Sequence, residues 1–415
     1  MWLWLHSYYL FTGRNGRLIM PVNLDVIPDK APDIKRPVTF RWVMAGGGIL
    51  LIGMGATLWF WQGERTGFKF WFVAICLPVL CWASLFALRR VGYKLERVGT
   101  HSWNKEREAL IASETARGQR FAWLVDKYLI NALETGEPGG KETQQVILDN
   151  SSVINHCQAR DGVSMIRHTA LPDFGTSKEI FERYVGEISG HARNMLAQLP
   201  ATMPCYIAFD LSDNLYELAD TLFSKIDWPL RKIRNLTGVS ILDYWLDQHH
   251  DIPTAILIIS AQIYDVPPQD SGEAVTMMLM SNRRLPTATP SRGVCIHRPQ
   301  INKQNTLNHA LSRAMLWAKL DMTAPLRGWI TGGKLSSEDI WSNACTALAP
   351  KLTAQRNANL DTVIGYAGAA APWQSLILAA RQCQTDAEPQ IIVVETSSSC
   401  HQLCTVTSEK TSGIV

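Results

Sequence analysis

Hydrophobic residues are concentrated in two stretches near the start of the chain, Trp42–Trp61 and Phe68–Leu88. Each is about 20 residues long, the length at which a helix spans a hydrocarbon core roughly 30 Å thick. The first stretch has no charged residue, and the second has only Lys69, at its edge. With a connection of six residues between them, the pattern predicts a transmembrane helical hairpin over residues 42–88. A buried helical pair in a large soluble domain is the alternative, but uncharged stretches of this length are rare there.

The orientation of the hairpin follows from the basic residues around it. The connecting loop holds Glu64 and Arg65, whereas both flanks are rich in Lys and Arg. The positive-inside rule therefore predicts that both termini and the main domain are cytoplasmic, with the short loop outside. Aromatic residues gather at membrane interfaces, and the predicted membrane-anchoring residues are Trp42, Trp59, Trp61, Trp71 and Trp82.

Residues 1–41 form a cytoplasmic lead-in to the hairpin. Its first segment, Met1–Phe11, is apolar but lacks the basic region and the small-residue cleavage site of a signal peptide. Met20 begins a segment that reads as an ordinary N-terminus, an extended lead-in that contains prolines. Residues 1–19 are therefore either an upstream translation artefact, the interpretation that we favour, or a weak interfacial segment.

The rest of the chain changes its hydrophobic pattern near residue 200. Residues 89–200 form a helical and mixed cytoplasmic region, in which apolar steps of three and four residues predict helices over 102–133 and 177–199. From 201 to 395, apolar runs of strand length alternate with amphipathic helices, which predicts a layered α/β domain. Residues 396–415 are rich in Ser and Thr and are expected to form a flexible tail.

Composition narrows the possible partners. The chain is 47% hydrophobic and 19% charged with a formal net charge of +3. It lacks the clustered basic stripes of a nucleic-acid binder, so we expect no nucleic-acid partner. Its nine cysteines are scattered without a disulfide or metal-site spacing, which is typical of free thiols in a reducing cytoplasm. No metal and no cofactor are predicted.

The α/β half resembles thiolases and ketosynthases. Those families carry a helix, a strand and a Gly-Glu-Ala segment in this order, here Ile241–Gln248, Thr254–Ile263 and Gly272–Ala274. They also have a glycine-rich G-x-x-G-A-A turn before a helix, here Gly365–Ala370 before Pro372–Cys383. The resemblance covers roughly Pro204 to Glu395 and implies a thiolase-like fold.

The catalytic residues of those families do not carry over. The resemblance implies a reactive cysteine at the head of the helix before the Thr254 strand, where the helix N-terminus would activate its thiolate. That place holds residues 236–240, Leu-Thr-Gly-Val-Ser. Ser240 offers a hydroxyl, but His249 and His250 lie two turns away. We therefore expect a thiolase-like scaffold that is not an enzyme, with no catalytic residue.

The arrangement of a membrane segment before an α/β body is also similar to accessory proteins of type VI secretion, the lipase-adaptor family. This resemblance implies a non-catalytic adaptor or chaperone in a bacterial inner membrane, with a secreted effector or a secretion-apparatus subunit as its protein partner. The alternative function is a membrane-associated acyltransferase or condensing enzyme, with Ser240 or Cys205 as nucleophile. Glycines 46–48, 53 and 55 also permit a homo-oligomer through close helix contact.

Overall fold

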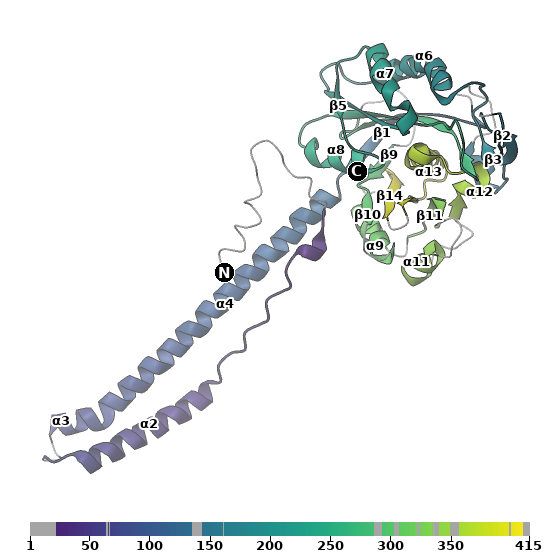
Figure 1. The fold of residues 1–415 in the computed structure, drawn as a ribbon. Coiled ribbons are helices and arrows are strands. Elements are labelled where there is room, and N and C mark those ends of the chain that lie inside the picture. Colours follow the sequence, from purple (N-terminus) through teal and green to yellow (C-terminus); the bar gives the residue numbers. More distant parts are fainter. Residues whose placement is uncertain are drawn as a thin grey trace. The chain divides into compact units, whose positions relative to one another are not determined.

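The computed structural model describes residues 22–409, except 64, 66, 135–142, 161, 286–292, 303–306, 322–323, 334, 336–339, 349–356 and 398–399. The chain divides into two compact units, an N-terminal unit over Val22–Thr115 and a body that begins at Ala116 (Figure 1). Residues 1–19, interpreted as an artefact, lie outside the described residues.

The N-terminal unit contains the predicted hairpin. Its elements are a short 3-10 turn η1 (Leu24–Val26), then α2 (Thr39–Phe60), α3 (Phe68–Trp71), a π-helical turn η2 (Phe72–Cys76) and α4 (Leu77–Gly118). The last three form one continuous helix. Both helices are long and apolar enough to cross a membrane. The second helix continues past the apolar stretch, which was predicted to end at Leu88, as far as Gly118.

Proline and glycine shape this hairpin. Pro78 has no N–H and crowds the preceding turn, and the helix widens to the π form directly before it. Gly53 on α2 lies under the Pro78 ring, and a Cβ at Gly46 would stand 2.7 Å from the Trp82 indole. These two glycines therefore let α2 and α4 approach closely.

The five tryptophans predicted to anchor the membrane differ in their surroundings. Trp82 donates from Nε1 to the Trp42 carbonyl at 2.8 Å, so these two pack between the helices. Trp61 contacts the Phe70 ring, whereas Trp59 and Trp71 are 84% and 51% exposed. Anchoring by all five stays a prediction.

The body alternates helices and strands from β1 onward. Its helical elements are α5 (Thr143–Leu148), α6 (Ser177–Leu196), η3 (Asp213–Leu218), α7 (Ala219–Ile226), α8 (Ser240–Gln248), α9 (Leu307–Trp317), α11 (Ile340–Leu348), α12 (Leu360–Ile364), η5 (Gly368–Ala370) and α13 (Ala371–Asp386). Its strands are β1 (Phe121–Asn131), β2 (Asn155–Gln158), β3 (Met165–Thr169), β4 (Cys205–Leu211), β5 (Leu230–Ile233), β6 (Ala255–Gln262), β7 (Ser271–Gly272), β8 (Ala274–Ser281), β9 (Val294–His297), β10 (Gln300–Asn302), β11 (Arg327–Thr331), β12 (Asn357–Asn359), β13 (Gln390–Ser397) and β14 (Cys400–Ser408).

The main sheet consists of two halves with the same topology. One half has the order β5-β4-β6-β8-β1 and the other β12-β11-β13-β14-β9, so each runs third, second, fourth, fifth, first along the chain. In each half the second, third and fourth strands are parallel, and the fifth is antiparallel to both neighbours. Strands β1 and β9 join the halves as an antiparallel pair. The body is therefore an internal duplication.

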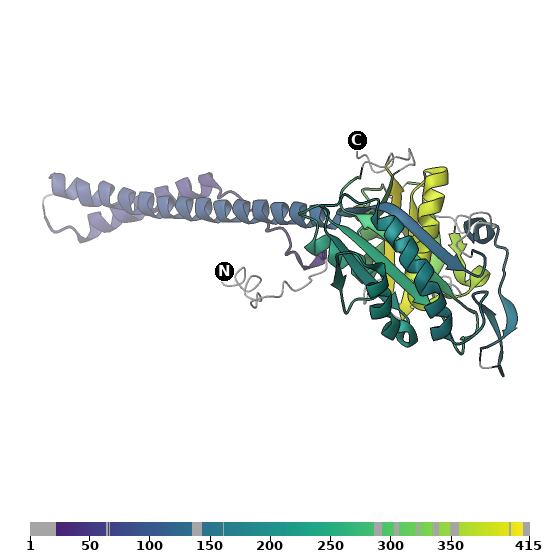
Figure 2. The ribbon, with the colours of Figure 1, turned by 90° about the horizontal axis from the view of Figure 1, so that it is seen from above.

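The duplicated halves enclose a central layer of helices. Along β6, Ile256 and Ile258 face a core shared with α8 and α13, whereas Leu257 and Ile259 face a core under α6 and α7. In the other half, the outward residues of β13 pack with α9 and α11. Helix, sheet, helix, sheet and helix thus follow one another, with α13 between the sheet halves and α6 and α7 on one outer face (Figures 1 and 2).

Two sequence predictions are corrected here. The helix expected over 102–133 ends at Gly118, and β1 follows. A β-bulge between Leu124 and Asp126 interrupts the alternation of this strand, so its apolar residues also fit helical spacing. The flexible tail expected over 396–415 contains β14, which lies between β13 and β9. The α/β body therefore extends beyond 201–395 in both directions.

Removing residues 400–415 is expected to unfold the body, because β14 is an inner strand whose loss exposes both neighbours. Removing only 410–415 leaves the strand intact and serves as the control. Circular dichroism of the full chain in detergent should give a cooperative melt for the shorter truncation and none for the longer. A similar melt for both would contradict the placement of β14.

Candidate functional site

The head of α8 lies where the resemblance places a nucleophile. No thiol is present in this loop, which runs from β5 to α8. Gly238 has φ +56°, and its N–H donates to Asp210 Oδ2 at 2.8 Å. The next N–H, of Val239, donates to Gln402 Oε1 at 3.2 Å. Ser240, in the first turn of α8, is partly exposed. The loop is thus held by side chains from both halves of the sheet.

Asp210 connects the two central helices. It is the penultimate residue of β4, is 3% exposed, and also accepts a hydrogen bond from Trp373 Nε1, in the first turn of α13, at 2.6 Å. Burial raises the pKa of this carboxyl to about 6, although both hydrogen bonds favour the ionised form. A carboxyl of this kind exchanges a proton close to neutral pH.

The glycine-rich turn packs tightly against the sheet. Ser260 Oγ donates to the Ala369 carbonyl at 3.1 Å, and the Ala369 N–H donates to Gln262 Oε1 at 3.0 Å. Gly365 and Gly368 have φ of +78° and +49°, and a Cβ at either would overlap neighbouring atoms. The small residues of the G-x-x-G-A-A turn are therefore required by close approach, as the sequence suggests.

Tyr366 lies within this turn and is partly exposed. Burial raises the pKa of its phenol to about 12, with further contributions from the carboxylates of Asp361, Glu395 and Asp210. Tyr366 therefore keeps its proton at neutral pH and can donate a hydrogen bond. Tyr366, Asp210 and Ser240 are thus three of the titratable or hydroxyl groups of this region.

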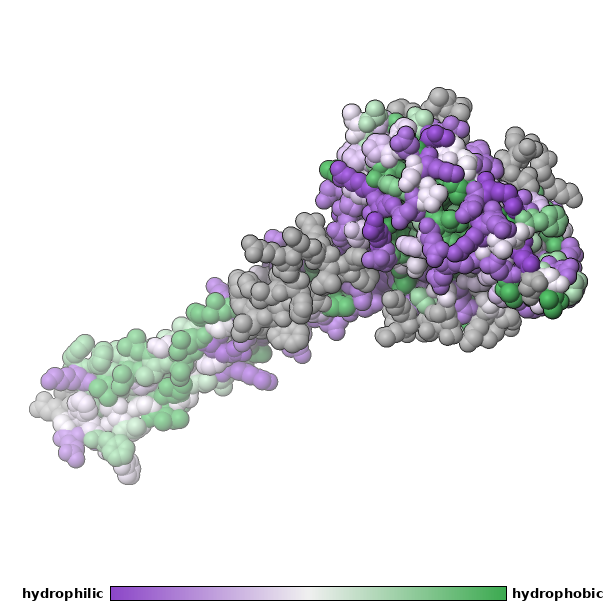
Figure 3. Space-filling model, turned by 45° about the horizontal axis from the view of Figure 1, so that its top comes forward, coloured by the Kyte–Doolittle hydropathy of each residue, from purple (hydrophilic) through white to green (hydrophobic). Residues whose placement is uncertain are grey.

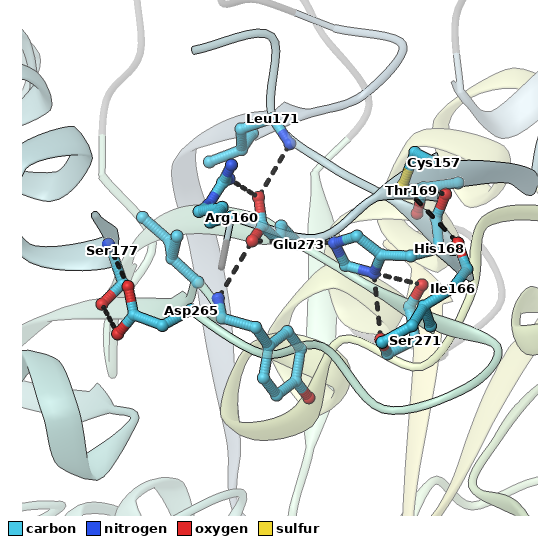
Figure 4. A network of polar contacts seen from close by, with 12 residues as sticks. Cys157, Arg160, Ile166, His168, Thr169, Leu171, Ser177, Asp265, Ser271 and Glu273 are labelled. Carbon is cyan, nitrogen blue, oxygen red and sulfur yellow. Dashed lines mark hydrogen bonds and ion pairs between the residues drawn. The ribbon is translucent and has the colours of Figure 1, made fainter. Parts of the chain in front are cut away.

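A second polar network borders the turn and centres on Glu273 (Figure 4). This carboxylate, whose side chain is fully buried, accepts the N–H groups of Leu171 and Tyr264 at 2.8 and 2.9 Å. It also forms an ion pair with Arg160 and lies 3.6 Å from His168 Nε2. Because β7 pairs with β3 and bridges to Tyr366, the network holds the small β2-β3-β7 sheet beside the turn.

Other histidines and the Cys205 thiol, which could in principle serve as base or nucleophile, lie elsewhere. His249 stacks on Tyr206 at 4.1 Å at the far end of α8. His297 is buried against Thr407. Cys205 begins β4, at the end opposite Asp210, and burial raises the pKa of its thiol to about 12. His249, His297 and Cys205 therefore all lie away from the head of α8.

The sequence analysis did not name several residues of this site: Asp210, Tyr366 and the partners of Glu273. Asp210 had a detectable signal, because an acidic residue near the end of the apolar run CYIAFDL is unusual in a buried strand. The partners of Glu273, Arg160 and His168, had none, since they are about 110 residues away in sequence.

No protein-family model matches the chain, and no curated protein matches it in sequence. Solved structures of condensing enzymes do resemble it. The PfaC keto synthase–chain length factor has a TM-score of 0.52 at 9% identity, over 70% of this chain and 43% of that chain. The ishigamide ketosynthase/chain length factor has a TM-score of 0.47 at 9% identity, over 69% and 99% of the two chains. A β-ketoacyl synthase from Burkholderia phymatum has a TM-score of 0.49 at 11% identity, over 70% of this chain and 99% of that chain.

The body has a thiolase-like ketosynthase fold. At these identities the likeness concerns the fold alone, and the chain spans less than half of the PfaC protein. This likeness contradicts the prediction that the chain is not an enzyme, because the PfaC protein that shares its fold is a keto synthase by name. The fold by itself assigns no activity to this chain. The PfaC structure is a keto synthase–chain length factor by name, so this comparison does not bear on the adaptor hypothesis.

The unfolding free energy should depend on pH through Asp210. Its pKa is about 6 when folded and 3.8 in its ordinary state, so the folded protein binds the proton more tightly. Stability from this group is complete below pH 4 and is lost as the pH rises to about 6, by about 3 kcal/mol. Asp210→Asn should remove that slope, measured by denaturant unfolding from pH 4 to 7. Parallel pH profiles for the two proteins would contradict the raised pKa.

Arg160→Ala is expected to destabilise the body by about 3–5 kcal/mol, because it leaves the buried Glu273 carboxylate without its cation. Arg167, which pairs with Asp270 where both side chains are about half exposed, offers a matched control. Arg167→Ala should cost less than about 1 kcal/mol. Equal losses in denaturant unfolding would mean that the Glu273 network does not depend on this ion pair.

Proposed function

We propose that the protein is a membrane-associated enzyme of the acyltransferase or condensing class, which acts on acyl thioesters at the head of α8. The observation that carries this proposal is the convergence of the starting ends of α8 and α13 on the buried carboxyl of Asp210. The fold of the body, which it shares with condensing enzymes, supports the same class of reaction. Under this proposal, the substrate is an acyl chain on a carrier thiol.

Ser240 is the proposed nucleophile. Its hydroxyl oxygen forms a bond to the thioester carbonyl carbon, the carbon–sulfur bond breaks, and the carrier leaves as a thiol. The hydroxyl proton must pass to a base and from there to the departing sulfur. Asp210 is the proposed base, since it holds the loop two residues before Ser240 and its raised pKa suits reversible protonation. Tyr366 would donate a hydrogen bond to the carbonyl oxygen as negative charge develops.

The hairpin would keep this chemistry at a membrane. We place the body on the cytoplasmic side of a bacterial inner membrane, as the basic flanks of the two apolar helices indicate. Confinement at the membrane raises the effective concentration of any lipid-bound acyl acceptor or membrane partner. A protein partner on the cytoplasmic side, such as an acyl carrier, fits this arrangement.

The proposal is tested by acylation of the detergent-purified full chain with an acyl-coenzyme A. Mass spectrometry should find one acyl group on the peptide that contains Ser240, and none in Ser240→Ala. Asp210→Asn should slow the acylation about 10²- to 10⁴-fold.

Cys205→Ala is the matched control for this experiment, because Cys205 lies on the same strand as Asp210 but at its opposite end. It should be acylated at the rate of the unaltered chain. Absence of any acyl adduct, or equal labelling of Ser240→Ala, would refute Ser240 as the nucleophile.

A further inference from the structure

One face of α4 carries a heptad pattern that the hairpin does not use. Its residues follow one another at alternating steps of four and three, and all are exposed. We call this set the seam: Leu77, Cys81, Ser84, Leu88, Val91, Leu95, Val98 and Ser102. Leu88, Leu95 and Val98 are each more than 60% exposed. The seam begins in the apolar part of the helix and continues beyond it. Figure 3 shows that hydrophobic residues cover the surface of the two apolar helices.

The chain's own contacts lie on the other face of α4. Trp82 packs on α2, and further along the helix Asn104 Oδ1 accepts the Ala31 N–H at 2.9 Å. Arg107 donates to the Pro28 carbonyl at 2.6 Å. Asn104 is nine residues from Leu95, which at 100° per residue places it on the opposite side of the helix. Intramolecular packing thus leaves the seam exposed among the described residues.

The spacing of the seam residues indicates that their partner is another helix. A repeat of 3.5 residues keeps a straight stripe only when helices supercoil around one another, which is the geometry of a coiled coil. Copies of one membrane protein insert with the same orientation, so their α4 helices are parallel and in register without further adjustment. A second copy therefore presents the same seam at the same height.

The charged residues and the glycines beside the seam are compatible with two parallel α4 helices in contact. The charged residues Arg89, Arg90, Glu96 and Arg97 occupy outer heptad positions, away from the seam. Lys94 and His101 occupy g positions beside the seam, and Glu106 occupies an e position. The His101 imidazole and the Glu106 carboxylate of neighbouring parallel helices face each other in this register and can form a hydrogen bond. Glycines 92 and 99 are also at e positions. A Cβ at either would meet no atom of the protomer within 4 Å, so both leave room for close approach of a second helix.

We propose that the protein self-associates through its seam, as a parallel bundle of α4 helices from two or more copies. In the middle of the seam, Leu88 and Leu95 occupy a positions, and Val91 and Val98 occupy d positions. This is the reverse of the Val-at-a, Leu-at-d arrangement that favours two strands, so the bundle can contain more than two copies. This surface is distinct from Gly46 and Gly53, which are occupied by contacts within one hairpin. The proposal is independent of the reaction at α8.

Cysteine cross-linking in membranes tests the proposal. The full chain with Cys76→Ser and Cys81→Ser removes the exposed thiols of the apolar segment. In this background Leu95→Cys places a thiol on the seam, and Arg97→Cys places one on an outer position two residues away. Mild oxidation should give a covalent dimer of Leu95→Cys, whereas Arg97→Cys stays at the protomer mass of 46.4 kDa.

Three results would overturn the proposal: no cross-link for Leu95→Cys, equal cross-linking of both variants, or a cross-link of Leu95→Cys to a different protein. A second measurement guards against a folding defect. Light scattering in detergent should give the full chain a mass of two or more protomers, and Leu95→Lys with Val98→Lys the mass of one. Circular dichroism of this double variant should be unchanged, because neither residue packs within the protomer.

Discussion

The body is organised by the need to bury nearly all of α13 and the apolar face of α8. A helix in such a layer requires an apolar sheet face above and below it, and the two sheet halves provide these faces with alternate residues of their strands. The same strands must then be covered on their outer faces, by α6 and α7 on one side and α9 and α11 on the other. Duplication of one topology satisfies both requirements. Each half supplies one sheet face toward the central helices and one pair of helices that covers the outer face of its sheet.

This burial also determines where polar groups can lie. The first N–H groups of a helix have no partner within it, so the starting ends of buried helices need acceptors from elsewhere. Here Asp210, Gln402 and Gln262 provide acceptors at these ends. These acceptors place polar groups at the starting ends of the central helices, in the region that we propose as the reaction centre.

The sequence predicted the elements whose pattern is uninterrupted. The hairpin, α6, β4, β6 and β13 follow from apolar periodicity, and the G-x-x-G-A-A turn is explained by close packing of small residues. Strand β1 was missed because its bulge breaks the alternation, and β14 because its hydroxyl-rich sequence resembles a mobile tail. The buried hydroxyls of Thr405 and Thr407 are paired with the Ala314 carbonyl and His297, contacts that exist only after folding. The partners of Glu273 could not be predicted from the sequence, because these contacts also form only on folding.

The missing thiol changes what the fold requires for acyl transfer. A helix N-terminus lowers the pKa of a thiol and so favours its reactive thiolate, whereas a serine hydroxyl needs a base to accept its proton. A base at this position must be partly desolvated to hold a proton near neutral pH, and Asp210 meets that condition because it lies between two helices rather than at the surface. The carboxyl that accepts hydrogen bonds from α13 and from the loop before α8 can therefore both hold these elements in place and exchange a proton. Its raised pKa reduces stability at neutral pH, a cost that a purely structural contact could avoid with asparagine.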